Sequence, residues 1–278
     1  MTKVSALVCV RNSAEVLEAC LISLTRSDIF EIIVIDGESV DNSIEIAKKY
    51  TDLVFSDNGH GLGYARKLGV EKVTSELLII MGPDDVLADT SLELAVDYLN
   101  KNKKVAGILA HKRLANIDNF WERGQDILYS SASTRPLRVI GNPSLYRTSM
   151  FLDFEYDPYY SANEDTDLCE RWWDAGFSVN WAPDSFRVLE SARQNRASVY
   201  QRYSWYGRGD FDFVVKWFEL DRKKAIRHLF HPLLNYMIRQ PLSLIKKGEI
   251  GAALFSWLAG MFRYIGFAKR VISKIGLR

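Results

Sequence analysis

Four short apolar runs, each followed by a polar turn and a helical pattern, constrain the fold of this chain more than any other feature. The runs are residues 4–10 (VSALVCV), 31–36 (EIIVID), 53–55 (LVF) and 77–81 (LLIIM). Strands that alternate with helices in this way predict a mostly parallel sheet with helices on both faces. The carboxyl ends of such strands meet at one edge of the sheet, where ligands usually bind.

Polar side chains stand where these expected strands end. Arg11 and Asn12 directly follow the first strand, and Asp36 ends the second. Asp84 and Asp85 follow the fourth strand after a Gly-Pro turn. Because parallel strands end at a common edge, we expect Arg11, Asp36, Asp84 and Asp85 to lie at the edge of the sheet where ligands bind.

The composition predicts a folded chain with a sizeable core. Of its 278 residues, 47% are hydrophobic and 26% are charged, which suits one large domain or one domain plus an appendage. The three cysteines are scattered without a CxxC pair, and the four histidines show no zinc-ligand pattern. No signal peptide is recognisable at the N-terminus. We therefore expect a cytoplasmic protein with reduced cysteines.

The first turn lacks the dinucleotide-binding fingerprint. It reads Arg-Asn-Ser where G-x-G-x-x-G would be required, and the chain has no G-x-x-x-x-G-K-[ST] phosphate loop. A nucleotide-binding oxidoreductase is therefore not favoured. The charge of a bound diphosphate would have to be neutralised by a divalent metal on carboxylates, by arginines, or by both.

Four segments in order along the chain carry a resemblance to a known family. They are VSALVCVRNSAEVLEACLISL from residue 4, IDGESVDNS from residue 35, GLGYARKLGVEKVTSELLIIMGPDD from residue 61 and NEDTDLCERWWDAGF from residue 163. At this spacing, about residues 3–215 resemble the family 2 glycosyltransferases of the GT-A fold. The resemblance implies an α/β, Rossmann-like fold and transfer of a sugar from a nucleotide-sugar donor.

For the donor, the resemblance implies a set of six residues. Three would line the base and ribose pocket, one would reach the nucleotide or diphosphate, and two would hold the metal and the donor sugar. In that order they are Arg11, Asn12 and Asp36, then Arg66, then Asp84 and Asp85. Each also has a simpler structural interpretation as a turn, cap or surface residue.

Gly82 departs from the family pattern, because it stands where the first carboxylate of the D-x-D motif is expected. Magnesium typically needs only one or two carboxylates together with substrate phosphates. We therefore expect a divalent cation, Mg²⁺ or Mn²⁺, on Asp84 and Asp85, with weak binding in the absence of donor. The alternative is a non-catalytic nucleotide-sugar-binding relative with a degenerate D-x-D site.

Glu164 and Asp165 begin the helical pattern of the fourth segment. By resemblance Asp165 is the general base, with Glu164 beside it. An inverting transfer is one in-line displacement and needs one base for the acceptor hydroxyl, whereas a glycosidase needs two carboxylates. Acidic residues are also common at helix starts because the helix dipole favours them there, so a structural role stays open.

Three arginines near the segment YGRGD are candidates for contact with a diphosphate on the donor or on a lipid-linked acceptor. They are Arg193, Arg196 and Arg208, in a region that resembles bacterial and archaeal exopolysaccharide and lipid-linked glycan transferases of the family. An exposed basic helix explains them equally well. We expect a long helix over residues 195–218 and a loop-rich segment over 116–140.

The last part of the chain is basic and amphipathic. Residues 222–278 hold twelve Lys or Arg and one acidic residue, Glu249, and their longest uncharged run, 250–262, has 13 residues. A spanning helix needs about 20 apolar residues, so an amphipathic helix lying in the interface of an anionic membrane is favoured. The alternative is that these helices pack on the catalytic domain or on another subunit. Nucleic acid is disfavoured because large apolar residues outnumber polar ones.

These patterns predict a GT-A domain over residues 1–220, with a nucleotide-binding half of about 1–112 and an acceptor half of about 113–220. Residues 221–278 would form a membrane-association tail. The expected activity is inverting transfer to a hydroxyl of a lipid-linked or membrane-proximal glycan, at the cytoplasmic face of the membrane. The sugar, the nucleotide, the acceptor and a homo-oligomeric state are left open.

Overall fold

Strand β1 (Val4–Val10) forms the centre of the main sheet, because parallel strands flank it on both sides. It pairs with β2 (Glu31–Asp36) and with β4 (Leu77–Met81). Almost every side chain in these three strands is buried, as expected for a sheet covered on both faces. The computed structural model describes residues 2–88, 92–132 and 137–276.

Four more strands complete this sheet in the order β3-β2-β1-β4-β8-β6-β9. They are β3 (Val54–Ser56), β6 (Val105–Leu109), β8 (Ser144–Arg147) and β9 (Ser178–Trp181). Only β8 runs antiparallel to its neighbours, so the prediction of a mostly parallel sheet is confirmed. A second sheet has the order β5-β10-β7, with bounds Asp85–Leu87, Arg187–Glu190 and His111–Leu114.

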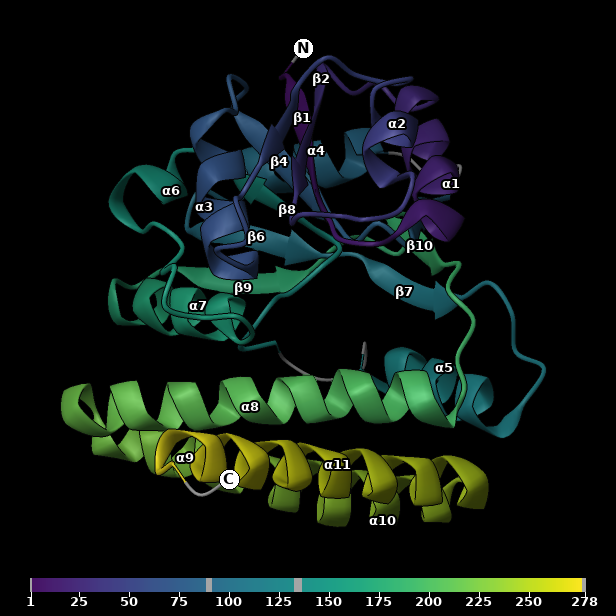
Figure 1. The fold of residues 1–278 in the computed structure, drawn as a ribbon, viewed down its shortest axis with the longest axis vertical. Helices are drawn as coiled ribbons and strands as arrows, with labels where there is room; N and C mark the ends of the chain where they lie inside the picture. The colour runs from purple at the N-terminus through teal and green to yellow at the C-terminus, as the bar shows by residue number, and fades with distance from the viewer. Residues whose placement is uncertain (1, 89–91, 133–136, 277–278) are drawn as a thin grey trace. The chain divides into compact units, whose positions relative to one another are not determined.

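Helices cover both faces of the main sheet (Figure 1). In β1, Val8 packs into one core cluster and Leu7 into the other, because successive side chains point to opposite faces. The first face carries α1 (Ala14–Thr25), α2 (Ser43–Ala47) and α4 (Leu92–Lys101). The second carries α3 (Leu62–Glu71), α6 (Met150–Asp153) and α7 (Glu164–Asp174).

The chain divides into two compact units. The first, Met1–Ala115 with Ala132–Ala192, contains both sheets, and the second is Asn116–Ser131 with Arg193–Arg278. The second unit is helical. Its elements are α5 (Phe120–Ala132), α8 (Arg196–Leu220), α9 (Arg222–His231), the π-helix η1 (Pro232–Arg239), α10 (Gln240–Lys246) and α11 (Ile250–Lys274). This division differs from the predicted boundary after residue 220, because α8 packs against α9 and α11.

Helix α5 shows that the prediction of a loop-rich segment over 116–140 is wrong for residues 120–132. The Oδ1 atom of Asn119 accepts hydrogen bonds from the backbone N–H groups of Trp121 (2.9 Å) and Glu122 (3.1 Å), which is N-cap geometry. An asparagine directly before FWERGQDIL is the signal that could have identified this helix. Residues 133–136 of the predicted loop lie outside the described residues.

A close helix crossing organises the second unit, in which α8 and α11 run side by side (Figure 1). A Cβ atom added at Gly207 would lie 1.8 Å from the carbonyl oxygen of Arg263, and one at Gly266 would lie 1.9 Å from that of Ser204. Glycine is therefore required at both positions. The crossing buries an ion pair in which Arg263 Nε lies 2.8 Å from Asp210 Oδ2, and His228 Nε2 lies 2.8 Å from Asp210 Oδ1.

This buried pair predicts a large loss of stability on substitution of Arg263. Burial by itself would raise the pKa of Asp210, but Arg263 and His228 hold it well below its usual range. Arg263→Leu leaves that carboxylate buried without its main counter-charge, and we expect the free energy of unfolding to fall by about 3–5 kcal/mol in urea titrations at pH 7. Lys67→Met, which removes the exposed pair with Glu155, is the control and should change it by less than about 1 kcal/mol. Equal losses in both variants would contradict this account.

Candidate active site

Asp36 ends β2 beside Val10, the last residue of β1, with which it is in parallel register. Its side chain is buried, and Oδ2 accepts a hydrogen bond from the backbone N–H of Ser39 at 3.1 Å. Oδ1 is also buried and has no hydrogen-bond partner among the described residues. An unpaired buried carboxylate oxygen is costly, so this atom is suited to accept from an N–H or O–H group of a ligand.

Arg11 and Asn12 form the turn that leaves β1, as predicted. Asn12 has a left-handed backbone (φ 50°), and its N–H donates to Ser39 Oγ at 2.9 Å. Its Oδ1 accepts from the N–H of Val40 at 2.8 Å, so this side chain ties two strand-end loops together. Arg11 is exposed at the same edge of the sheet. The turn therefore lies next to Asp36, with Asn12 engaged in loop structure.

Asp57 belongs to the same strand edge but was not predicted as a site residue. It follows β3, and its backbone N–H donates to the carbonyl of Asp36 at 2.9 Å. Its carboxylate is buried and accepts from the N–H groups of Gly59 (2.8 Å) and Gly61 (3.2 Å). The glycines are needed because both have positive φ angles. An aspartate two residues before a glycine at a strand end is the signal that could have identified this loop.

Asp85 does not fit its predicted role as a metal ligand. It is 0% exposed, Oδ2 accepts from the N–H of Gly82 at 2.8 Å, and Oδ1 lies 2.7 Å from Lys112 Nζ. The same Nζ lies 2.8 Å from Glu190 Oε2, so one lysine serves two buried carboxylates. Burial raises the pKa of Asp85 to about 6, and Lys112 opposes this rise. The structure thus gives Asp85 a role in holding the loop after β4.

Asp84 is the carboxylate that this loop leaves at the edge of the sheet. Its backbone carbonyl accepts from Ser191 N–H (2.7 Å) and Ser191 Oγ (3.0 Å), while its side chain is only partly buried. A Cβ atom at Gly82 would lie 2.8 Å from Asp84 Oδ1 and 3.0 Å from Asp85 Oδ2. A side chain at this position would therefore require the Asp84 and Asp85 carboxylates to shift.

The residues present fit a metal that binds together with substrate. Within residues 2–88, 92–132 and 137–276, no group of three or more His, Cys, Asp or Glu could hold an ion. Asp84 supplies one hard oxygen ligand at a strand end. Magnesium accepts such a site when phosphate oxygens and water complete its shell.

Arg66 does not lie open to a nucleotide as predicted, because it is buried on α3 and forms an ion pair with Glu164 at the start of α7. The ring of Tyr156 lies 5.6 Å from its guanidinium carbon. Burial raises the pKa of Glu164 to about 7, with Arg66 opposing and Asp165 adding to the shift. Glu164 is therefore a buried partner of Arg66, next in the chain to the partly buried Asp165.

Asp165 is only partly buried, unlike its neighbour. Its Oδ1 accepts from the backbone N–H of Thr166 at 2.7 Å, which leaves Oδ2 to face the backbone of Gly141. A Cβ atom at Gly141 would lie 2.7 Å from that oxygen. Of the two predicted catalytic carboxylates, Asp165 is the one whose surroundings suit contact with a substrate.

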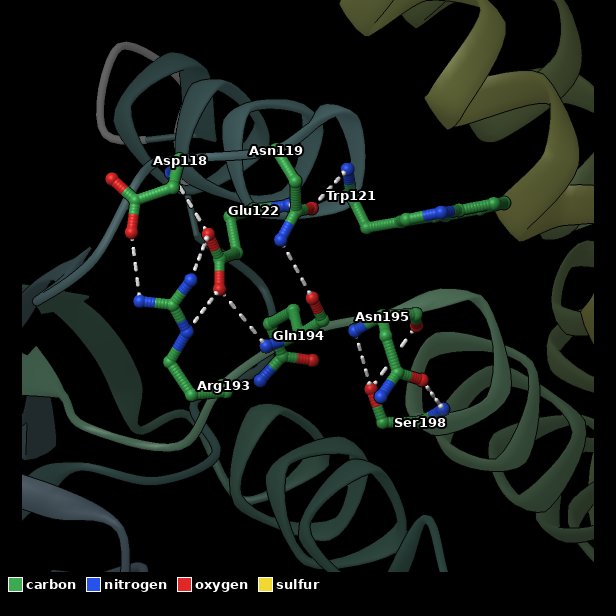
Figure 2. Close-up of polar contacts among 8 residues, drawn as sticks. All are labelled: Asp118, Asn119, Trp121, Glu122, Arg193, Gln194, Asn195 and Ser198. Carbon is green, nitrogen blue, oxygen red and sulfur yellow. Dashed lines mark hydrogen bonds and ion pairs between the residues drawn. The ribbon is translucent and has the colours of Figure 1, made fainter.

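The three arginines of the second unit do not form one cluster. Arg193 is held by two carboxylates, with Nη1 2.8 Å from Asp118 Oδ2 and Nε 2.8 Å from Glu122 Oε1 (Figure 2). Asn119 Nδ2 donates to the carbonyl of Gln194 at 3.1 Å beside them (Figure 2). These bonds join α5 to the start of α8, so Arg193 is occupied within the protein. The other two, Arg196 and Arg208, are exposed on α8 about 18 Å apart along its axis.

The Arg66–Glu164 pair predicts a pH effect that an isosteric substitution removes. The folded-state pKa of Glu164 lies above its unfolded value, so its contribution to stability is present at low pH and is lost as the pH rises from about 4.5 to 7. Glu164→Gln should abolish that part of the pH dependence, a difference on the order of 3 kcal/mol in unfolding free energy. Urea titrations between pH 4 and pH 8 measure it. Glu155→Gln, at a mostly exposed site, is the control, and parallel pH curves for wild type and Glu164→Gln would refute the assignment.

Comparison with known proteins identifies the family of this chain. The family model described as glycosyl transferase family 2 matches residues 5–156, more than half of the chain. A cholesterol galactosyltransferase of Borreliella burgdorferi is 38% identical over 100 residues, covering 33% of this chain and 28% of that protein. A PGL/p-HBAD biosynthesis glycosyltransferase of Mycobacterium tuberculosis is 34% identical over 94 residues, 30% of this chain and 37% of that protein. The chain thus spans about a third of the length of these relatives.

Solved structures share the fold at low sequence identity. A mannosyltransferase of Pyrobaculum calidifontis, in complex with GDP-Man and Mn²⁺, has a TM-score of 0.68 at 13% identity. The alignment covers 98% of this chain and 88% of the mannosyltransferase chain. Staphylococcus aureus TarS with UDP-GlcNAc has a TM-score of 0.55 at 14% identity, with 99% and 92% covered. This likeness confirms the predicted GT-A fold. With the family match over residues 5–156, it follows that the chain belongs to glycosyl transferase family 2.

Proposed function

We propose that this protein transfers a sugar from a nucleotide-sugar donor to a hydroxyl of a lipid-linked or membrane-proximal glycan, by a single inverting displacement. The observation that carries the proposal is the contrast between two adjacent carboxylates. Glu164 is buried against Arg66, whereas Asp165 is partly exposed at the start of α7. One available carboxylate suits a single displacement, which needs one base, and does not suit a mechanism with two.

The donor would bind at the strand edge formed by β1, β2 and β3. The orphan Oδ1 of Asp36 would accept from the base or ribose, and Arg11 stands exposed beside it. A carboxylate bond of this kind discriminates strongly, because a ligand without the donor group leaves the oxygen unpaired. Solved structures with this fold include complexes with GDP-Man and with UDP-GlcNAc, which supports a nucleotide-sugar without identifying it.

Asp165 would act on the acceptor. Its Oδ2 would take the proton of the acceptor hydroxyl as that oxygen attacks the anomeric carbon, while the bond to the diphosphate breaks on the opposite face of the sugar. Thr166 holds the other carboxylate oxygen through its backbone N–H, which orients the base. The Arg66–Glu164 pair fixes the start of α7 from behind and so positions Asp165.

A divalent cation would be held by Asp84 together with the diphosphate. When bound, Mg²⁺ or Mn²⁺ supplies positive charge that stabilises the leaving diphosphate. Structures with this fold contain Mn²⁺ or Mg²⁺, as in the P. calidifontis enzyme and the M. tuberculosis glucosyl-3-phosphoglycerate synthase with Mg²⁺ and UDP. We do not assign Asp85 to this role, because its carboxylate is buried and paired with Lys112.

The acceptor is proposed to be membrane-borne, with the enzyme peripheral on the cytoplasmic face. Two facts support this: a relative is a cholesterol galactosyltransferase, and the second unit exposes many large apolar side chains next to basic ones. Among the described residues one helix, α11, is long and apolar enough to span a membrane, although half of its apolar window is buried within the protein.

A non-catalytic nucleotide-sugar-binding relative is the second candidate. Gly82 favours it, because the first carboxylate of the D-x-D pattern is absent. The two candidates differ in turnover, and the next experiment separates them.

Asp165→Asn should reduce sugar transfer by about 10²–10⁴-fold, because an amide cannot accept the acceptor proton. A thermal-shift screen of nucleotide-sugars with Mn²⁺ would select the donor, and transfer to membrane extract would be followed with a radiolabelled sugar. Donor-induced stabilisation should be retained by the variant. Asp174→Asn, at the exposed end of the same helix, is the matched control. Unchanged turnover in Asp165→Asn would show that Asp165 is not the base. Absence of turnover in the wild type would favour the non-catalytic candidate.

Gly82→Ala should weaken Mn²⁺-dependent donor binding about 10-fold or more, because the new Cβ displaces the Asp84 carboxylate from its place. Isothermal titration with the selected nucleotide-sugar, with Mn²⁺ and with EDTA, measures the effect. Gly251→Ala, where a Cβ meets nothing within 4 Å, is the control and should bind like wild type. The metal proposal fails if EDTA leaves wild-type donor binding unchanged.

A further inference from the structure

Helices α9, η1 and α10 form one continuous helix that exposes a row of large apolar side chains. We define these six residues as the apolar ridge: Ile226, Phe230, Leu234, Ile238, Leu242 and Ile245. Each is between 42% and 56% exposed. Side chains three or four positions apart are neighbours on a helix, so the ridge is a contiguous apolar surface. Soluble proteins rarely expose such a surface without a partner for it.

The π-helix η1 keeps the ridge on one face. Each step of four residues overshoots a full α-helical turn by about 40°, so four such steps would carry the row about 160° around the helix axis. A π-helix makes i to i+5 bonds and turns through a smaller angle per residue. Because η1 (Pro232–Arg239) lies under the middle of the ridge, it reverses the drift there. The helix is thus built to present one straight apolar edge.

The charge beside the ridge favours one kind of partner. Residues 222–247 contain no Asp or Glu. Six exposed basic residues flank the ridge: Arg222, Lys223, Arg227, Arg239, Lys246 and Lys247. A protein partner would usually bring charges of both signs, whereas an apolar row between basic side chains complements the acyl boundary and phosphate groups of an anionic leaflet.

Helix α11 supports binding in the plane of a membrane and not across it. Its inner face is part of the core of the second unit, with Phe255 and Phe262 buried, and Arg263 is paired with Asp210 of α8. Extracting α11 to span a bilayer would break that pair. Its outer face exposes Leu254 and Trp257 about one turn apart, and tryptophan is favoured at the level of lipid headgroups.

We propose that the apolar ridge inserts into the interfacial layer of an anionic lipid leaflet, with the axis of α9–η1–α10 parallel to the membrane surface. This inference deepens the proposed function, on which it rests for its biological role. Its physical basis is independent of catalysis, since it depends only on the ridge and the basic residues beside it.

Flotation of the full-length protein with lipid vesicles tests the proposal. With phosphatidylcholine vesicles containing about 30% phosphatidylglycerol, the double variant Leu234→Gln/Ile238→Gln should partition at least about 10-fold more weakly than wild type. Leu152→Gln is the matched control, because Leu152 is 81% exposed on α6 of the first unit and lies outside the ridge. It should bind vesicles like wild type. Circular dichroism melting would establish that both variants are folded.

The electrostatic part has its own test. Lys246→Gln/Lys247→Gln, pure phosphatidylcholine vesicles and 0.5 M NaCl should each weaken binding severalfold, because each removes or screens attraction to the anionic headgroups. Binding that is equal for wild type and the ridge variant overturns the proposal. So does a wild-type oligomer in vesicle-free buffer that the ridge variant converts to monomer, since a second copy would then cover the ridge.

Donor binding separates this proposal from the proposed function. The ridge variant should keep wild-type stabilisation by nucleotide-sugar and Mn²⁺ in the thermal-shift assay, because none of its changes lies at the strand edge. Loss of flotation with intact donor binding supports the ridge even if transfer activity is never found. Normal flotation of the ridge variant alongside activity that depends on Asp165 would leave the enzyme proposal standing and refute the ridge.

Discussion

The buried ion pair between Arg66 and Glu164 is the interaction on which the candidate site depends. It joins α3 to the first residue of α7, and both side chains are buried, so removal of Glu164 would leave the Arg66 guanidinium without its partner. The pair fixes the helix start that carries Asp165 next to Gly141. Arg66, which resembles a ligand-binding arginine, is thus buried in an ion pair, and in the proposed mechanism it positions Asp165 through Glu164.

A contrast like that between Glu164 and Asp165 is found after β4, where two adjacent carboxylates also have different surroundings. Asp85 is enclosed with Lys112 and Glu190 and bonds back to Gly82, whereas Asp84 remains at the strand edge. Glu164 and Asp85 are thus buried and hold the local structure, whereas their neighbours Asp165 and Asp84 are only partly buried. Gly82 is part of this arrangement, since any side chain there would press on both aspartates. The departure from the D-x-D pattern is therefore built into the loop.

The second unit owes its form to a different buried pair, Asp210 with Arg263, which holds α8 against α11. This explains why the basic tail is a folded part of the protein and not a separate appendage. With the inner faces of the helices engaged in that core, their outer apolar residues are left for another partner. The predicted amphipathic helices thus belong to a packed helical unit, which also includes α5. The sequence interpretation missed α5 because its signal is a single cap residue, Asn119.

The sequence by itself determined the alternation of strands and helices, the strand ends that carry Arg11, Asp36 and Asp84, and the basic apolar pattern of the last 57 residues. These are properties of local periodicity and of residue type, which neighbouring positions in the chain specify. Only the tertiary structure decided which carboxylates are buried, because Lys112, Glu190 and Glu164 reach their partners from elements distant in the sequence. For the same reason only the tertiary structure showed that Arg66 lies in a buried ion pair and that the exposed Arg193 is paired with Glu122, since burial and counter-charges depend on what packs nearby.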